Sequence, residues 1–227
     1  MSRISVLTPV QQRFLAGFFR VDGCPFYLSG GTALSGFYLG HRYSDDLDFF
    51  TRDRENLRGA DRYVDQAVLA AGLEKERTVP RGDLVQYFFS GDPHPEHPLT
   101  KSEFVFDTPP HFAEARRFDG VIVDDLLNIA VNKLTIHTRR EPKDYVDLYM
   151  VVQSGHCRLE DLIPMAKEKM VGLDELTIAA HFSEVDDLPN LEVFQRAYML
   201  VPLDLADLRR WYREWARRLF EIIPPLR

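Results

Sequence analysis

The apolar residues of this 227-residue chain follow a helical spacing close to its start. The segment Thr8-Pro-Val-Gln11 has the form of a capping box with proline at the first helical position. The apolar positions that follow at helical spacing are Phe14, Leu15, Phe18 and Phe19. The pattern therefore predicts a helix that begins after Thr8 and ends at Phe19 or Arg20.

Helical spacing returns from Leu57 to Ala71, where Gly72 is a natural stop. Three strand-like runs follow, at Leu73 to Val79, Leu84 to Ser90 and Ser102 to Phe106. The prolines of segment 91–98 predict a loop between the last two runs. That loop contains His94 and His97, but an exposed, proline-rich loop disfavours a metal-binding interpretation of them.

The pattern changes from strands to helices at Asp124 and stays helical to the end of the chain. We therefore expect an α+β protein with two domains, a small mixed-sheet domain of residues 1–123 and a helical domain of residues 124–227. Asp204 is expected to cap the last helix, which carries an apolar stripe of Leu208, Trp211, Tyr212, Trp215 and Leu219. Its arginines could grip a polynucleotide backbone, but a solvated face paired with neighbouring acids is the favoured interpretation.

Two glycines, Gly30 and Gly31, separate an apolar run from a helix-like segment that continues from Thr32 to Leu39. Glycine at such a turn lets backbone N–H groups approach phosphate oxygens without a Cβ in the way. The turn is therefore a candidate phosphate site.

Asp46 and Asp48 flank Leu47 in a run that ends at Phe49 and Phe50. If this run is a strand, its period of two places both carboxylates on one face and sends Leu47 and Phe49 to the core. Paired carboxylates beside a phosphate site are the ligands that Mg²⁺ prefers.

A third acid is expected on a neighbouring strand, where Glu103 and Asp107 share one face. Glu103 is the better candidate because it lies inside the run, whereas Asp107 precedes two prolines that end it.

A second polar cluster lies at the expected corner between two helices. Lys133 and His137 are one helical turn apart, Arg140 is expected at the helix end, and Asp144 and Asp147 lie on one side of the next helix. The basic groups could neutralise a nucleotide triphosphate, or the cluster could be a structural set of ion pairs.

Composition sets limits on partners and compartment. The formal net charge of −7 argues against nonspecific binding of nucleic acid, so any RNA contact must be local. Cys24 and Cys157 show no ligand spacing and no disulfide framework. No signal peptide or long apolar run is visible, so we expect a cytoplasmic protein without membrane contact.

The motifs together resemble the nucleotidyltransferase superfamily of DNA polymerase β type. Within that superfamily the chain is similar to the AbiEii/AbiGii toxin family from about Phe26 to Val152. The segments that carry the likeness are Gly30-Gly-Thr-Ala-Leu34, Arg42-x-Ser-x-Asp-Leu-Asp-Phe49, Lys133-Leu with Arg140, and Lys143-Asp-x-x-Asp-Leu148. The chain departs from the usual pattern in having Glu103 where aspartate is commoner.

The resemblance implies a role for each matched residue. Asp46, Asp48 and Glu103 would be the catalytic, metal-holding acids, and the nucleotide would be held by Gly30, Gly31, Thr32, Ser44, Lys133, Arg140, Lys143 and Asp144. The implied protein is a Mg²⁺-dependent enzyme that moves a nucleoside monophosphate from an NTP to an acceptor hydroxyl. RNA such as tRNA would be the acceptor, and a cognate antitoxin would be a partner. Transfer to an antibiotic or a protein, and an inactive nucleotide-binding module, stay open as alternatives.

Overall fold

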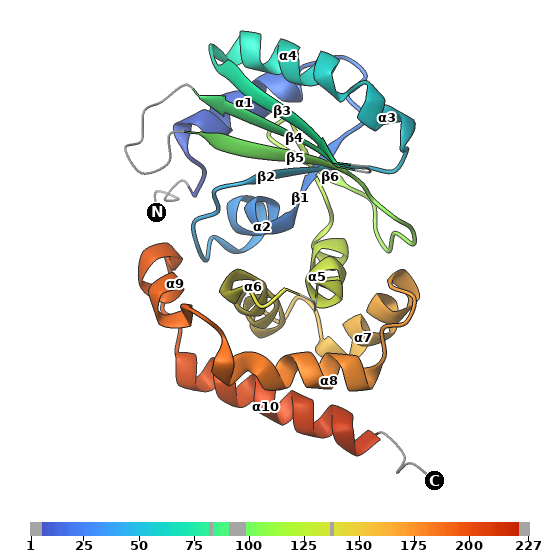
Figure 1. The fold of residues 1–227 in the computed structure, drawn as a ribbon, viewed down its shortest axis with the longest axis vertical. Coiled ribbons are helices and arrows are strands. Elements are labelled where there is room, and N and C mark those ends of the chain that lie inside the picture. The colour runs from blue at the N-terminus through green and yellow to red at the C-terminus, as the bar shows by residue number, and fades with distance from the viewer. Residues whose placement is uncertain (1–5, 82–83, 91–98, 137–138, 223–227) are drawn as a thin grey trace. The chain divides into compact units, whose positions relative to one another are not determined.

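The computed structural model describes residues 6–81, 84–90, 99–136 and 139–222 of the chain (Figure 1). Segment 91–98, which contains His94 and His97, lies outside the described residues, as does His137. The chain divides into two compact units, Met1–Asp125 and Leu126–Arg227, and each is described by itself. Among the described residues, no helix combines the length and the apolar character needed to cross a membrane.

A mixed sheet forms the centre of the first unit (Figure 1). Its strands are β1 Tyr27–Ser29, β2 Leu47–Thr51, β3 Glu74–Arg81, β4 Leu84–Ser90, β5 Thr100–Phe106, β6 Arg116–Phe118 and β7 Val121–Val123. They lie in the order β3-β4-β5-β2-β1-β7-β6. The pairs β2/β5 and β1/β7 are parallel and the other neighbours are antiparallel, so the prediction of a mixed sheet is confirmed.

Helices cover the sheet and fill its core with aromatic rings. They are α1 Pro9–Phe18, α2 Gly30–Ala33 with its continuation as the π-helix η1 Leu34–Leu39, α3 Glu55–Arg58 and α4 Ala60–Ala71. The capping box at Thr8 is present as predicted. Phe14 and Phe18 of α1 are fully buried and contact Phe49 of β2. Helix α1 also packs against α4, which lies on the same side of the sheet (Figure 1).

One predicted helix of the first unit is divided in two. The spacing from Leu57 to Ala71 predicted a continuous helix, but α3 ends at Arg58 and α4 begins at Ala60. Gly59 lies between them with φ of −98° and ψ of 3°, outside the helical region. The predicted stop is confirmed, because Gly72 takes the left-handed conformation that ends α4.

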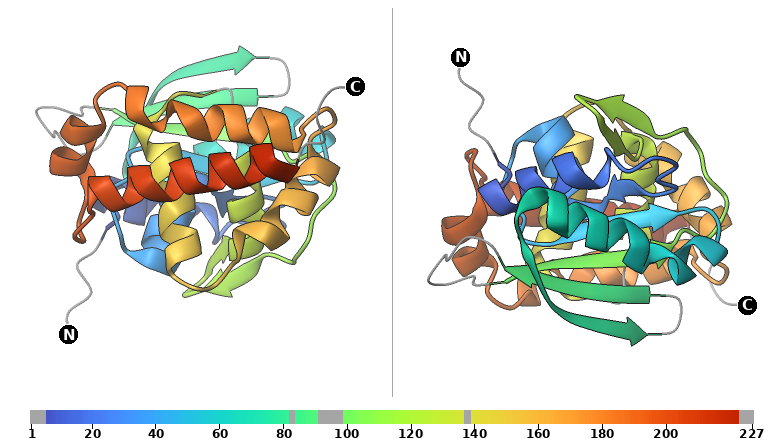
Figure 2. Two further views of the ribbon diagram at one scale, coloured as in Figure 1. Left: turned by 90° about the horizontal axis from the view of Figure 1, so that it is seen from below. Right: turned by 90° about the horizontal axis from the view of Figure 1, so that it is seen from above.

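The second unit is built from helices, as the sequence predicted, and among its described residues Met199 alone lies in a β-bridge. Its helices are α5 Leu126–Thr135, α6 Pro142–Gln153, α7 Leu159–Lys169, α8 Glu175–Ser183, the 3-10 helix η2 Glu184–Asp187, α9 Leu191–Tyr198 and α10 Leu205–Ile222. Helices α8 and α10 run side by side (Figure 2). The buried stripe of α10 is Leu208, Tyr212, Ala216 and Leu219, so the prediction that placed Trp211 and Trp215 in it is wrong: both are only half-buried.

Candidate functional site

The glycine turn lies where β1 passes into α2. Gly30 has φ of +68°, and a Cβ built on it would lie 2.2 Å from Oδ2 of Asp48. A Cβ on Gly31 would lie 2.4 Å from Nη2 of Arg42. The turn therefore needs glycine for two reasons, because Gly30 adopts a left-handed backbone and because an acid and a guanidinium group lie against the two Cα atoms.

We expect Gly30→Ala to destabilise the protein more than Gly40→Ala does. Gly40 has a similar φ of +61° but nothing within 4 Å of its Cβ position, so Gly40→Ala should cost only the backbone strain, about 1 to 2 kcal/mol. Gly30→Ala adds a clash with Asp48 and should cost at least about 1 kcal/mol more. Denaturant unfolding measures both values, and equal losses would contradict the close packing of Asp48 on the turn.

Asp48 and Glu103 lie directly opposite one another on neighbouring strands. The parallel register of β2 and β5 pairs Asp48 with Glu103, and the antiparallel register of β4 and β5 pairs Gln86 with Glu103. Paired residues of adjacent strands point to the same face of the sheet. Leu47 and Phe49 are fully buried on the other face, as the alternation predicted. Asp46 precedes β2 and reaches the same face as Asp48.

A lysine that the sequence analysis did not single out lies among these acids. Lys101 Nζ is 2.8 Å from Oδ2 of Asp46 and 3.1 Å from Oε1 of Glu103. Burial opposes the charge on this ammonium group, but the hydrogen bonds and charges of the two carboxylates outweigh burial and raise the pKa of Lys101. A usable signal was present in the sequence, because Lys101 precedes Glu103 by two positions and the period of a strand places both on one face.

The chemistry of this face suits a hard divalent cation. Asp46, Asp48 and Glu103 offer only carboxylate oxygens, the donors that Mg²⁺ prefers. The ammonium of Lys101 shows that Asp46 and Glu103 can share one cation. Among the described residues no three acid, histidine or cysteine side chains are already gathered as a metal site. Binding of a metal would therefore require Lys101 to move from between the two carboxylates.

Asp107, the other candidate for the third acid, is engaged elsewhere. Tyr27 donates a 2.5 Å hydrogen bond from its hydroxyl to Oδ2 of Asp107, and Nδ1 of His111 lies 3.1 Å from the same oxygen. Burial together with the charge of Asp107 raises the pKa of Tyr27 far above its ordinary value. Asp107 is itself buried and lies four positions beyond Glu103, about 13 Å further along the strand direction.

Thr32 and Ser44 lie between the glycine turn and the acids. The hydroxyl of Thr32, a buried residue, donates to the backbone carbonyl of Asp46. Ser44 is half-buried in the loop before β2, with its Oγ 3.1 Å from the Cβ position of Gly31. The structure therefore brings these two residues together with Gly30, Gly31 and Asp46 in the first unit.

Lys133 and Asp144 form a buried ionic cluster in the second unit. Lys133 Nζ is 2.8 Å from Oδ1 of Asp144 and 2.7 Å from Oδ2 of Asp147. The three side chains are only 7%, 4% and 0% exposed. The second oxygen of Asp144, Oδ2, is buried without a hydrogen-bond partner among the described residues. The cluster therefore combines one cation with two carboxylates and leaves one acceptor open.

Arg140 and Lys143 lie at the solvent-exposed side of the same region. Arg140 was expected at a helix end, but α5 ends at Thr135 and Arg140 lies in the connection to α6. Its Nε is 3.4 Å from Glu184 Oε2, and its side chain is 51% exposed. Lys143, on the first turn of α6, lies 3.9 Å from Glu141 and is 38% exposed.

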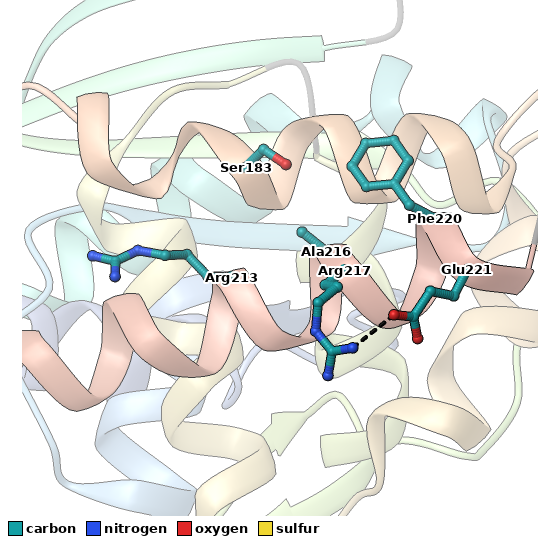
Figure 3. Close-up of a pocket in the computed structure, with 6 residues that line it drawn as sticks. All are labelled: Ser183, Arg213, Ala216, Arg217, Phe220 and Glu221. Carbon is teal, nitrogen blue, oxygen red and sulfur yellow. Dashed lines mark hydrogen bonds and ion pairs between the residues drawn. The ribbon is translucent and has the colours of Figure 1, made fainter.

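Two arginines of α10, Arg213 and Arg217, line a separate cavity of about 460 Å³ in the helical unit (Figure 3). Its lining residues are Ser183, Arg213, Ala216, Arg217, Phe220 and Glu221. Arg213 makes a double contact of 2.8 Å with Asp186, and Arg217 pairs with Glu221 at 2.6 Å. The structure agrees with the favoured interpretation, in which neighbouring acids pair with the arginines of this face. None of the predicted site residues lines the cavity.

Comparison with known proteins places the chain in a family. A relative from Aquifex aeolicus, the uncharacterized protein aq_aa25, is 28% identical over 156 residues, which cover 66% of this chain and 68% of the relative. The crystal structure of JHP933 from Helicobacter pylori matches with a TM-score of 0.57 and 20% identity, over 93% of this chain and 89% of that one, which shows a shared fold. The model of the family described as nucleotidyl transferase AbiEii toxin, type IV toxin–antitoxin system, matches residues 13–224. The chain therefore belongs to the AbiEii family of nucleotidyl transferase toxins.

Proposed function

We propose that this protein transfers a nucleoside monophosphate from an NTP to the hydroxyl of an RNA acceptor such as tRNA, as the toxin of a toxin–antitoxin pair. One observation carries the proposal: Asp48 and Glu103 lie opposite each other on adjacent strands, beside the glycine turn at the start of α2. Family membership supports the reaction class. The acceptor and the role of the cognate antitoxin are our inference.

Asp46, Asp48 and Glu103 are the residues that would hold Mg²⁺. When bound there, Mg²⁺ would neutralise charge on the phosphates and on the attacking oxygen. The chain contributes a rigid arrangement, because Asp48 and Glu103 are fixed by ladder pairing on β2 and β5. The ammonium of Lys101 pairs with the carboxylates of Asp46 and Glu103 and would balance their charge in the metal-free protein.

The glycine turn would bind the phosphates of the NTP. Helix α2 begins at Gly30 without a hydrogen bond from the side chain of Ser29, and the N–H groups of a first helical turn have no partner within the helix and suit an anion. The oxygen of the acceptor hydroxyl would attack the α-phosphorus, its proton would pass to solvent, and the bond to the bridging oxygen would break with loss of pyrophosphate. Thr32 and Ser44 would orient the phosphates from the same side.

In the helical unit we propose Lys133, Arg140, Lys143 and Asp144 as nucleotide-binding residues. The open acceptor Oδ2 of Asp144 suits a hydroxyl or amino donor of the nucleotide. Arg140 and Lys143 keep exposed cationic side chains that suit phosphate oxygens. Lys133 contributes by holding Asp144 in place, because its ammonium is already shared between two carboxylates.

The direct test is incubation of the purified protein with each radiolabelled NTP, Mg²⁺ and total RNA or protein extract. We expect label in an RNA fraction with at least one NTP, and no label in a parallel reaction with an Asp46→Asn/Asp48→Asn variant. If the label appears in protein or in a small molecule, the proposed reaction stands but RNA is not its acceptor. Binding of NTP without any transfer would identify an inactive nucleotide-binding module.

A pair of conservative variants separates the two candidates for the third acid. Glu103→Gln removes a charge opposite Asp48 and should slow transfer at least about a hundredfold, which is about 2.7 kcal/mol of activation free energy. Asp107→Asn should slow it less than about threefold, because that carboxylate contacts Tyr27 and His111 instead. Initial rates at saturating NTP measure both, and the reverse ranking would move the third ligand to Asp107.

A further inference from the structure

The loop before β2 is tied to the first helix by one buried side chain. Gln11, in the first turn of α1, is fully buried. Its Nε2 donates to the carbonyl oxygens of Ser44, at 2.8 Å, and Asp45, at 3.0 Å, which lie 33 and 34 residues further along the chain. A glutamine amide has two such hydrogens, so Gln11 uses both on consecutive carbonyls of one loop.

The same side chain also closes the capping box of α1. Oε1 of Gln11 accepts a hydrogen bond from the backbone N–H of Thr8 at 2.9 Å. The backbone N–H of Gln11 donates to Oγ1 of Thr8 at 3.2 Å. The oxygen and the nitrogen of the Gln11 amide therefore have separate structural roles. The oxygen fixes the start of α1, and the nitrogen holds the loop.

Side chains also hold the carbonyls on either side of those two. Arg42 Nη1 donates to the carbonyl of Tyr43 at 2.7 Å, and the hydroxyl of Thr32 donates to the carbonyl of Asp46. Arg42 and Thr32 are buried, like Gln11. The backbone from Tyr43 to Asp46 is thus fixed by three buried side chains instead of by a strand ladder.

This matters because Asp46 lies outside the sheet. Strand β2 begins at Leu47, so ladder pairing fixes the backbone of Asp48 but does not reach Asp46. The carboxylate of Asp46 nevertheless reaches Lys101 and the face that carries Glu103. Its position must come from the loop, and Gln11 supplies the hydrogen bonds immediately before it.

We propose that Gln11 is a positioning residue for the metal site, which holds the loop so that Asp46 faces Asp48 and Glu103. The inference rests on the proposed function, because it takes Asp46 as a metal ligand. Residues that orient metal ligands typically change metal affinity or activity about 10- to 100-fold when they are replaced.

Two variants of Gln11 separate the hold on the loop from the helix cap. Gln11→Glu keeps an oxygen for the N–H of Thr8, and glutamate is itself a capping-box residue, but its carboxylate has no hydrogen to donate to the two loop carbonyls. Gln11→Met keeps the length of the side chain and removes both functions. One control is Thr8→Ala, which weakens only the helix cap. The other is Gln12→Met, because the amide of Gln12 is exposed and donates to the carbonyl of Leu7.

The measurements are Mn²⁺ affinity by calorimetry, backbone hydrogen exchange over residues 43–48, and melting temperature. We expect both Gln11 variants to bind Mn²⁺ about 10- to 100-fold more weakly than wild type and to exchange faster over 43–48. Thr8→Ala should lower the melting temperature and keep the wild-type Mn²⁺ affinity, and Gln12→Met should leave both unchanged. Gln11→Glu should lower the melting temperature at least as much as Gln11→Met does, because its buried carboxylate would face the two loop carbonyl oxygens.

The outcomes distinguish the inference from the function it rests on. If the wild type binds Mn²⁺ and both Gln11 variants bind it equally well, the positioning role is wrong and the proposed function stands. If the wild type fails to bind Mn²⁺ with or without NTP, the metal site itself is wrong, and the positioning role falls with it. If backbone hydrogen exchange over residues 43–48 is unchanged in Gln11→Met, Gln11 does not hold the loop, whatever the Mn²⁺ affinity of the variant.

Discussion

Asp48→Asn is expected to slow nucleotidyl transfer about a thousandfold. The substitution keeps the shape of the side chain against Gly30 but removes the charge that faces Glu103 across the β2/β5 ladder. A thousandfold loss corresponds to about 4 kcal/mol of activation free energy, within the range expected when charge stabilisation by a metal is lost. Single-turnover rates with labelled NTP measure the effect.

The fold should survive this change, so that lost activity reports on chemistry. Asp48 is half-buried at the edge of the site, and its replacement should change the free energy of unfolding by no more than about 1 kcal/mol. Asp65→Asn, at an exposed position on α4, is a control that removes the same charge from the same unit. If Asp48→Asn is as active as Asp65→Asn, the proposed catalytic role of this face is wrong.

The sequence predicted the alternation of buried and half-buried side chains along β2, because alternation within a strand is a local property. Leu47 and Phe49 are buried and Asp48 faces away from them, as a period of two requires. The register that sets Asp48 beside Glu103 was not predictable in the same way. It depends on β2 and β5 pairing in parallel although 48 residues of chain, 52–99, lie between the two strands.

The features that could not be identified from the sequence depend on contacts between residues far apart in the chain. Gln11 was identified as a helix cap, and its cap is present, but nothing local shows that the other end of its amide reaches Ser44. Strands β6 and β7 were missed because each has three residues and β6 begins with two arginines. Such short strands are defined by their partners, since their own periodicity is too brief to detect.

The role of the cluster around Lys133 could not be predicted from local spacing. The sequence placed Lys133, Asp144 and Asp147 on the facing ends of two helices but could not choose between a nucleotide site and a structural set of ion pairs. Burial supplies new information, because the three side chains are at most 7% exposed. Burial of a charge depends on every element packed around it, and local spacing does not record that.

Lys133→Met is expected to lower the free energy of unfolding by about 3 to 5 kcal/mol. The variant leaves the carboxylates of Asp144 and Asp147 buried and facing each other without a cation. For a protein of this length the loss corresponds to a fall in melting temperature on the order of 10 °C. Urea denaturation and thermal unfolding measure it.

Lys167→Met is the matched control for this prediction. Lys167 pairs with Glu175 at 2.6 Å, but those side chains are 38% and 30% exposed. Solvent screens that pair, so its loss should cost about 1 kcal/mol or less. Equal costs for Lys133→Met and Lys167→Met would show that the Lys133 cluster is not a buried ionic unit.

A triple variant separates the stability of the cluster from its part in nucleotide binding. In Lys133→Met/Asp144→Leu/Asp147→Leu no charge or polar group is left buried without a partner, so most of the lost stability should return, because replacing a whole buried ionic unit by apolar residues is often nearly neutral. NTP affinity can then be measured on a folded protein. If affinity falls at least about tenfold while stability is restored, the open acceptor of Asp144, which Lys133 holds in place, contacts the nucleotide. If affinity equals that of the wild type, the cluster serves only to hold α5 and α6 together, and the proposed nucleotide-binding residues of the helical unit reduce to Arg140 and Lys143.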